Sequence, residues 1–106
     1  MPYIIDFEAG ALEDLKALRK GERVKVLKAI EEHLTYEPTR QSKSRIKRLR
    51  PGTRPPYRLR VDAFRVYYDV QMEDQTVTIY GVVDKARSLE WLTAFVQKAA
   101  GKDDLQ

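Results

Sequence analysis

The spacing of apolar residues changes within the first third of the chain. Tyr3–Phe7 is rich in β-branched and aromatic residues, which is typical of a short strand. After it, apolar residues recur every three or four positions with charged residues between them, a pattern that predicts amphipathic helices. These apolar positions are Leu12, Leu15 and Leu18, followed by Val24, Leu27, Ile30 and Leu34. The break at Gly21 predicts two antiparallel helices.

A segment rich in polar residues, proline and glycine separates these helices from the strands that follow. Pro38 is expected to end the second helix, because proline disfavours helical geometry in the residue before it. Thr39–Ser44 is polar and predicts a loop, and Ile46–Leu49 is compatible with a short edge strand. Residues 51–56 hold Pro and Gly in a combination typical of a turn.

The strongest strand signal is a pair of alternating segments, Tyr57–Val61 and Phe64–Val70. If Asp62 and Ala63 form a two-residue turn between them, residues at equal distances from the turn face each other. The predicted pairs are Tyr57/Tyr68, Leu59/Val66 and Val61/Phe64 on one face, and Arg58/Tyr67 and Arg60/Arg65 on the other. One face of this hairpin is therefore apolar, and the other carries three arginines.

A further strand and a helix complete the expected elements. Thr76–Val83 alternates like a strand, and the apolar residues from Leu89 to Ala99 have helical spacing. The polar residues 101–106 predict a flexible tail. The predicted fold class is α+β, in which an antiparallel β-sheet packs against two N-terminal helices and a C-terminal helix follows. Residues 1–100 are expected to form a single domain.

Composition narrows the chemistry available to the chain. Its 106 residues match the common size of one domain, and a content of 42% hydrophobic and 34% charged residues is ordinary for a globular protein. No apolar run approaches the ~20 residues that span a bilayer, and the first residues lack a signal-peptide pattern, so we expect a cytoplasmic protein. The chain has no cysteine and one histidine, His33, which argues against a metal site, and no cofactor is expected.

The net charge of +4 hides a strong asymmetry along the sequence. Residues 40–65 contain ten basic side chains and one acidic side chain, for a net charge of +9, whereas the remainder carries −5. Such a basic block is typical of a surface that binds a polyanion, because neutralising phosphates releases counterions. An acidic protein partner is an equally suitable ligand for it. The block therefore predicts nucleic acid, an acidic protein or both as partners.

The hairpin arginines point to an anion site within this block. Like charges directly opposed on one sheet face repel each other, so stability alone gives no reason to place Arg60 opposite Arg65. Arg58 lies on the same face, and Lys85 and Arg87 follow the last strand, where they are expected to extend the positive surface. Pairing of the arginines with helix carboxylates remains the alternative. Trp91 fits either a core position or a stacking platform.

The ordered set of these segments resembles the bacterial RelE/ParE toxins of type II toxin-antitoxin systems, over about residues 2–96. The likeness begins with the strand Tyr-x-Ile-x-Phe and the helical pattern Ala11-x-x-Asp14-Leu15-x-x-Leu18, and continues with Lys47-x-Leu49 before the Pro/Gly loop. It is most specific in Tyr57-Arg58-Leu59-Arg60-Val61, in Phe64-Arg65-Val66-Tyr67-Tyr68 and in Lys85-x-Arg87.

The resemblance to the RelE branch implies catalytic roles for five residues. Arg58 and Arg60 stand where RelE has two lysines, and Arg65 matches an arginine that holds the scissile phosphate. Lys85 takes the position of an arginine associated with leaving-group protonation, and Trp91 that of a tyrosine that stacks on a base. Because an arginine does not give up its proton, Arg60 departs from the family pattern for a general base. Additional RNA contacts are expected from Lys43, Arg45, Lys47, Arg48, Arg50, Arg54, Tyr67 and Arg87.

The family resemblance implies a toxin that cleaves mRNA on the ribosome, by attack of a ribose 2′-hydroxyl on the adjacent phosphate. Its expected partners are a cognate acidic antitoxin, the ribosome and mRNA. Two alternatives remain: a ParE-like protein that inhibits DNA gyrase without nuclease activity, and a degenerate toxin that only binds RNA or its antitoxin. The density of arginine on the hairpin favours RNA cleavage.

Overall fold

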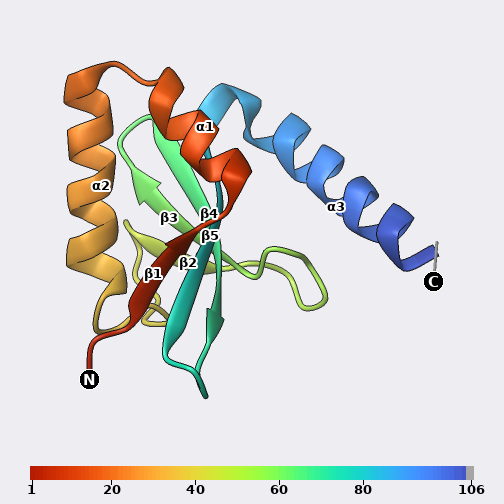
Figure 1. The fold of residues 1–106 in the computed structure, drawn as a ribbon, viewed down its shortest axis with the longest axis horizontal. Coiled ribbons are helices and arrows are strands. Elements are labelled where there is room, and N and C mark those ends of the chain that lie inside the picture. Colours follow the sequence, from red (N-terminus) through yellow and green to blue (C-terminus); the bar gives the residue numbers. More distant parts are fainter. Residues whose placement is uncertain (105–106) are drawn as a thin grey trace.

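A computed structural model describes the backbone of residues 1–104 and the side chains of residues 1–98. The elements follow in the order β1 (Ile4–Phe7), α1 (Ala9–Ala17), α2 (Lys20–Leu34), β2 (Ile46–Arg48), β3 (Tyr57–Val61), β4 (Phe64–Gln71), β5 (Thr76–Asp84), the 3₁₀ turn η1 (Lys85–Arg87) and α3 (Ser88–Asp104). The predicted α+β class is confirmed (Figure 1). Of the predicted tail, residues 101–104 continue α3, and residues 105–106 lie outside the described part of the chain.

The five strands form one mixed sheet in the order β1-β5-β4-β3-β2. Strands β2 to β5 pair antiparallel as expected, but β1 joins the edge of β5 in parallel. The expectation of a wholly antiparallel sheet was therefore wrong for this strand. A single-strand pattern carries no information on the direction of a partner that is far away in the sequence.

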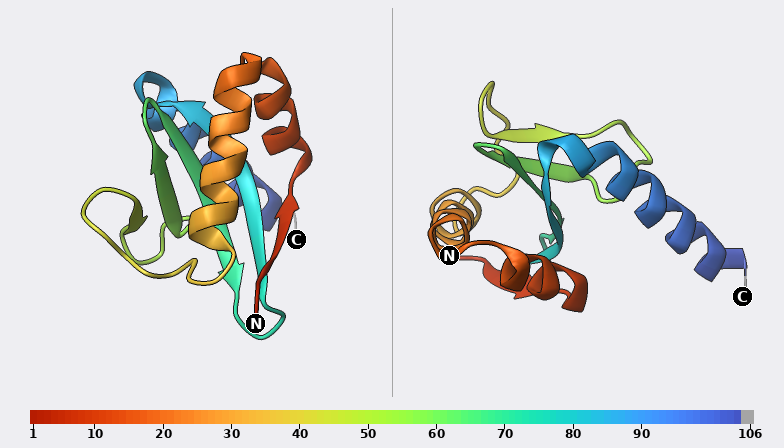
Figure 2. Two further views of the ribbon diagram at one scale, coloured as in Figure 1. Left: turned by 90° about the vertical axis from the view of Figure 1, so that its left-hand side faces the viewer. Right: turned by 90° about the horizontal axis from the view of Figure 1, so that it is seen from above.

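Helices α1 and α2 cover one face of the sheet, which we call the inner face, and α3 leaves from the opposite, outer face (Figure 2). The two N-terminal helices run in opposite directions, as expected, and their axes are inclined to one another (Figures 1 and 2). The second helix begins at Lys20, so the break lies at Leu18 and Arg19, and Gly21 is inside the first turn of α2. Arg23 supports this corner, since its guanidinium donates to the carbonyl oxygens of Leu15 and Leu18, each at 3.0 Å.

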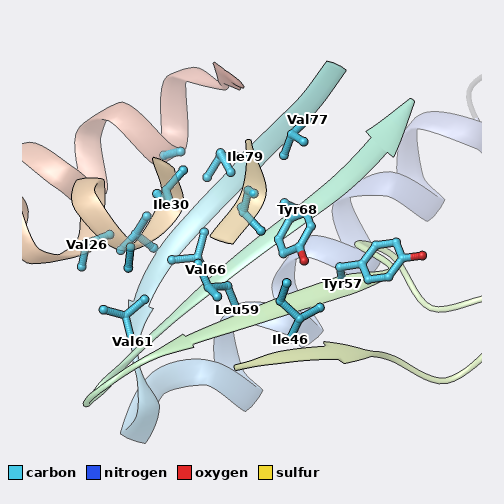
Figure 3. Packing of buried hydrophobic residues seen from close by; sticks show 14 of the residues in the cluster. Val26, Ile30, Ile46, Tyr57, Leu59, Val61, Val66, Tyr68, Val77 and Ile79 are labelled. Carbon is cyan, nitrogen blue, oxygen red and sulfur yellow. The ribbon is translucent and has the colours of Figure 1, made fainter. Parts of the chain in front are cut away.

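The core lies between the inner face and these helices (Figure 3). Leu59, Val66 and Ile79 on the sheet meet Val26 and Ile30 on α2. The sequence pattern placed three residues on the apolar faces of the helices that are exposed in the structure: Leu12, Val24 and Leu27. Their places in the core are taken by Ala11, Val26 and Ala29. The predicted helices are present. However, their apolar residues cover more than one face of each helix, so the pattern does not show which of these residues meet the sheet.

The β3–β4 hairpin has the predicted register in all five of its pairs. Asp62 takes the left-handed conformation at the turn, with φ 51°, which aspartate tolerates better than most residues. On the other side of β4, Tyr67 pairs with Gly81 and Tyr68 with Ile79, so Tyr80 is the extra residue of a β-bulge. The bulge lies under the first turns of α3 and shifts the register of β5 there.

Candidate functional site

The arginine-bearing side of the hairpin is the outer face of the sheet. Arg60 pairs with Arg65, and Arg58 with Tyr67, while Leu59 between them points into the core. The three arginines therefore share one face, as the alternation predicted. We refer to Arg58, Arg60 and Arg65 as the arginine cluster.

Arg65 is the buried member of the cluster, with only 6% of its surface exposed. Its Nη1 donates to the carbonyl oxygens of Asp62 and Phe64, both at 2.9 Å, so the side chain also closes the hairpin turn. Burial, and then the charges of Arg58 and Arg60, lower the pKa of the Arg65 guanidinium. These repulsions remain in the folded chain and an anion bound between the arginines would relieve them.

Carboxylates do not neutralise the cluster. The ion pairs among the described side chains are Lys16–Glu13, Lys25–Asp62 and Arg40–Glu37, and none includes Arg58, Arg60 or Arg65. At longer range Asp84 attracts Arg65, which acts against the lowering of the Arg65 pKa, and Asp62 attracts Arg60. The alternative in which helix carboxylates pair with the arginines is thus absent from this part of the chain.

Two polar atoms at the cluster are buried without a hydrogen-bond partner: Nε of its member Arg58 and the hydroxyl of the neighbouring Tyr67. The two residues face each other on β3 and β4. Tyr67 is completely buried, yet it lies outside the hydrophobic core because its ring stands on the outer face. Buried groups without a partner are uncommon in proteins, and their explanations include a bound water molecule, an ion and a catalytic or binding role.

Trp91 covers Tyr67 from α3. Their rings stack with centroids 4.9 Å apart and planes inclined by 12°, and the indole also stacks on Phe95 at 5.1 Å. The indole fits because Gly81 has no side chain: a Cβ there would lie 2.3 Å from Trp91. From the sequence, Trp91 was compatible with either a core position or a stacking platform. The sequence analysis missed the role of Gly81, although glycine inside a strand often marks a close approach of another group to the backbone.

The two basic residues after β5 have different surroundings. Lys85 is exposed, and its backbone N–H donates to Ala63 O at 2.7 Å, which holds η1 against the turn that Arg65 closes. Arg87 instead lines a cleft with Asp14 and Trp91, and its charge acts on Asp14. The structure thus places Lys85 beside the hairpin turn and Arg87 in the cleft between α1 and α3.

The other predicted RNA contacts are spread around the β2 edge. All six are exposed: Lys43, Arg45, Lys47, Arg48, Arg50 and Arg54. Lys47 pairs with Arg58 and so shares the outer face, and Arg45 donates to Arg60 O at 3.2 Å. Arg48 points to the other side, where its guanidinium lies 4.9 Å from the ring centroid of Tyr57.

Among the described residues, two clefts lie away from the arginine cluster. The first, of about 410 Å³, runs between α1, the end of β5 and α3, and includes Asp14. The carboxylate of Asp14 accepts from Val82 N–H at 2.9 Å, and burial raises its pKa. Sequence analysis quoted Asp14 only as part of a helical motif. The second, of about 500 Å³, lies between the end of α2 and the loop before β2, and contains His33.

Among the described residues, no group of three or more His, Cys, Asp or Glu side chains could hold a metal ion. Within the same part of the chain, no helix has the length and the apolar character needed to cross a membrane.

Comparison with solved structures finds the same fold in RelE toxins. The toxin-antitoxin complex RelBE2 from Mycobacterium tuberculosis matches with a TM-score of 0.67 and 27% identity, covering 79% of this chain and 99% of that one. The archaeal RelE–RelB complex from Pyrococcus horikoshii OT3 matches with a TM-score of 0.63 and 25% identity, covering 82% and 99%. A free mutant of E. coli RelE matches with a TM-score of 0.65 and 24% identity, covering 89% and 93%. The comparison with curated proteins finds no match.

A family model provides the assignment that these structural matches support. The model described as the ParE toxin of type II toxin-antitoxin systems, parDE, matches residues 5–89. This range runs from β1 through the arginine cluster to the start of α3. The chain therefore belongs to the RelE/ParE family of type II toxins.

Proposed function

We propose that this toxin is a ribosome-dependent mRNA endonuclease that acts in the cytoplasm. The observation that supports this most directly is the arginine cluster, in which three guanidinium groups share one sheet face without a carboxylate partner among the described side chains. A phosphodiester that gains negative charge during cleavage is the kind of group that such a preorganised positive site stabilises.

In the proposed reaction, the 2′-hydroxyl of a ribose loses its proton to solvent water while its oxygen forms a bond to the adjacent phosphorus, and the bond from phosphorus to the 5′-oxygen breaks. Arg58, Arg60 and Arg65 bind the phosphate oxygens while charge accumulates on them. Lys85 donates a proton to the departing 5′-oxygen, for which its position beside the hairpin turn is suitable. Arg60 remains protonated throughout and acts as a clamp.

The exposed basic residues on and around β2 are proposed to hold the RNA of the message and the ribosome. Lys47 and Arg45 adjoin the arginine cluster directly, through Arg58 and Arg60. Such contacts go to the phosphate backbone and contribute affinity without sequence preference.

We also propose a cognate acidic antitoxin as the partner that neutralises the protein. Two of the matched structures are described as complexes of RelE-type toxins with their antitoxins. On this chain, α3 exposes 78% of Leu89 and leaves Leu92 and Phe95 half-buried, next to a strongly basic sheet face. Opposite charge accelerates the encounter, and burial of these apolar side chains slows dissociation.

The test is reconstituted translation with purified toxin, ribosomes and a defined mRNA. The wild type should cleave the message only when ribosomes are present. Arg60→Ala should lose cleavage, whereas Lys28→Ala, which removes one charge from α2 on the other side of the sheet, should retain it. Full cleavage by Arg60→Ala at equal protein levels would contradict the proposed site.

A second candidate follows from the family model, whose description is that of ParE toxins. In that case the protein would inhibit DNA gyrase by protein contact and would not cut RNA. A supercoiling assay run beside the translation assay separates the two functions. Loss of supercoiling with intact message supports the gyrase inhibitor. RNA binding without either effect would indicate a toxin that has lost its activity.

A further inference from the structure

The stack of Tyr67 and Trp91 is unusual for a pair that belongs to the outer face. Tyr67 is fully buried there by α3, while the core of the molecule lies on the opposite face (Figure 3). The two ring planes are nearly parallel at a centroid separation of 4.9 Å, an arrangement that a nucleobase also adopts on an aromatic side chain. Gly81 provides the flat floor beside Tyr67 on which the indole rests.

Polar atoms beside this stack have no hydrogen-bond partner, and a ligand more polar than indole could supply one. The Tyr67 hydroxyl and Arg58 Nε are buried and unpartnered, although they lie on directly opposed residues. Ser88, one helical turn before Trp91 on α3, also has a buried hydroxyl without a partner. The indole of Trp91 stacks on the Tyr67 ring, and its carbon atoms cannot form a hydrogen bond to an unpartnered group beside it.

Helix α3 is attached in a way that permits it to leave. Trp91 and Phe95 attach it to the outer face, the ring of Phe95 lying 5.2 Å from that of Tyr80, and the helix then projects beyond the sheet (Figures 1 and 2). Leu89 and Val96 on the same helix are exposed. Lifting the first turns of α3 would uncover Tyr67 and leave the packing between the inner face, α1 and α2 unchanged.

We propose that Tyr67 is the stacking platform for an unpaired base of single-stranded RNA, and that Trp91 occupies this platform in the absence of RNA. This inference rests on the proposed function, because it places the base beside the arginine cluster that would bind its phosphate. The Tyr67 hydroxyl and Arg58 Nε then bond to polar atoms of the nucleotide. Trp91 itself is a poor platform in this arrangement, since both Tyr67 and Phe95 already stack on its ring.

The experiment measures binding of a fluorescently labelled single-stranded RNA with 2′-O-methyl riboses, which cannot be cleaved. Trp91→Ala removes the competitor and should bind at least about fivefold more tightly than the wild type, because stacking of one base is worth ~1–3 kcal/mol, or roughly 5- to 150-fold. Tyr67→Leu should bind at least about fivefold more weakly. In the double variant, Tyr67→Leu should abolish the gain from Trp91→Ala.

Two further measurements test the proposal even if Trp91→Ala or Tyr67→Leu fails to fold. Gly81→Ala adds a methyl group where the indole lies, so it should displace Trp91 without removing it and should also tighten binding. Because the chain has one tryptophan, its emission should shift to longer wavelength when RNA binds and remain unchanged with inorganic phosphate alone. Circular dichroism melting checks that each variant is folded.

Whether Trp91→Ala strengthens or weakens RNA binding shows which of Tyr67 and Trp91 is the platform. Weaker RNA binding by folded Trp91→Ala would make Trp91 the platform and overturn the proposal, as would unchanged binding by folded Tyr67→Leu. Failure of mRNA cleavage on the ribosome, with these binding changes intact, would contradict the proposed nuclease and leave the platform standing. Cleavage of mRNA by the wild type, together with unaltered RNA binding by Tyr67→Leu, would support the proposed nuclease and contradict the platform.

Discussion

Arg60 and Arg65 occupy directly opposed positions on β3 and β4, yet only Arg65 is buried. Arg65 donates two hydrogen bonds to the hairpin turn, whereas Arg60 is exposed and repels it. Arg65 therefore contributes to the fold as well as to the proposed phosphate site, and its burial lowers the pKa of its guanidinium. Arg60 is available to the ligand alone. This difference separates the structural and the binding contributions of the cluster.

Replacement of Arg65 by alanine is expected to affect both folding and binding. Loss of the bonds to Asp62 and Phe64 should lower the free energy of unfolding by about 2 kcal/mol, measured by urea denaturation. Arg60→Ala is the matched control and should change it by less than about 0.5 kcal/mol. Both should weaken RNA binding. An Arg65→Ala protein as stable as the wild type would show that these bonds contribute nothing.

Lys85→Arg should separate phosphate binding from proton transfer. The substitution keeps the positive charge beside the hairpin turn but replaces an ammonium group, which can give up a proton, with a guanidinium group, which does not. We expect the variant to bind ribosomes normally and to cleave the message at least ~100-fold more slowly, the usual size of a general acid-base contribution. Near wild-type cleavage by Lys85→Arg, combined with inactivity of His33→Ala, would move the assignment to the histidine.

Arg23→Ala should loosen the corner between α1 and α2. The Arg23 guanidinium donates to the carbonyl oxygen of Leu15, which also accepts from Leu18 N–H at 3.2 Å, and to the carbonyl oxygen of Leu18. We expect a loss of about 1–3 kcal/mol in the free energy of unfolding, measured by thermal or urea denaturation. Arg19→Ala, one turn earlier and exposed, serves as the comparison. Equal stability of the two variants would rule out a specific role for Arg23.

Asp14→Asn tests the buried carboxylate in the cleft between α1 and α3. Burial raises the pKa of Asp14 above 3.8, so its ionised form is disfavoured in the folded state and stability is lost as the pH rises through the folded pKa. Asparagine still accepts the bond from Val82 N–H but does not ionise. The stability of Asp14→Asn relative to the wild type should therefore increase with pH above 3.8, as measured by urea denaturation across a pH series. A pH-independent difference would contradict the shift.

The sequence alone determined the elements and the hairpin register. Alternation in Tyr57–Val61 and Phe64–Gln71 is local information, because strands that a two-residue turn joins have only one register compatible with an apolar inner face. The same register placed Arg58, Arg60 and Arg65 together. The basic block and the family resemblance likewise follow from local composition and from the order of short segments.

Tertiary structure decided what depends on contacts between distant segments. The parallel pairing of β1 with β5, and the choice of Val26 over Val24 for the core, depend on how helices and sheet meet. The stack of Tyr67 with Trp91 arises only when α3 covers the bulge at Tyr80, and the unpartnered hydroxyl of Tyr67 and the burial of Arg65 are likewise properties of the folded chain. Sequence spacing identifies which side chains share an element, but desolvation and close approach depend on what the rest of the chain places above them.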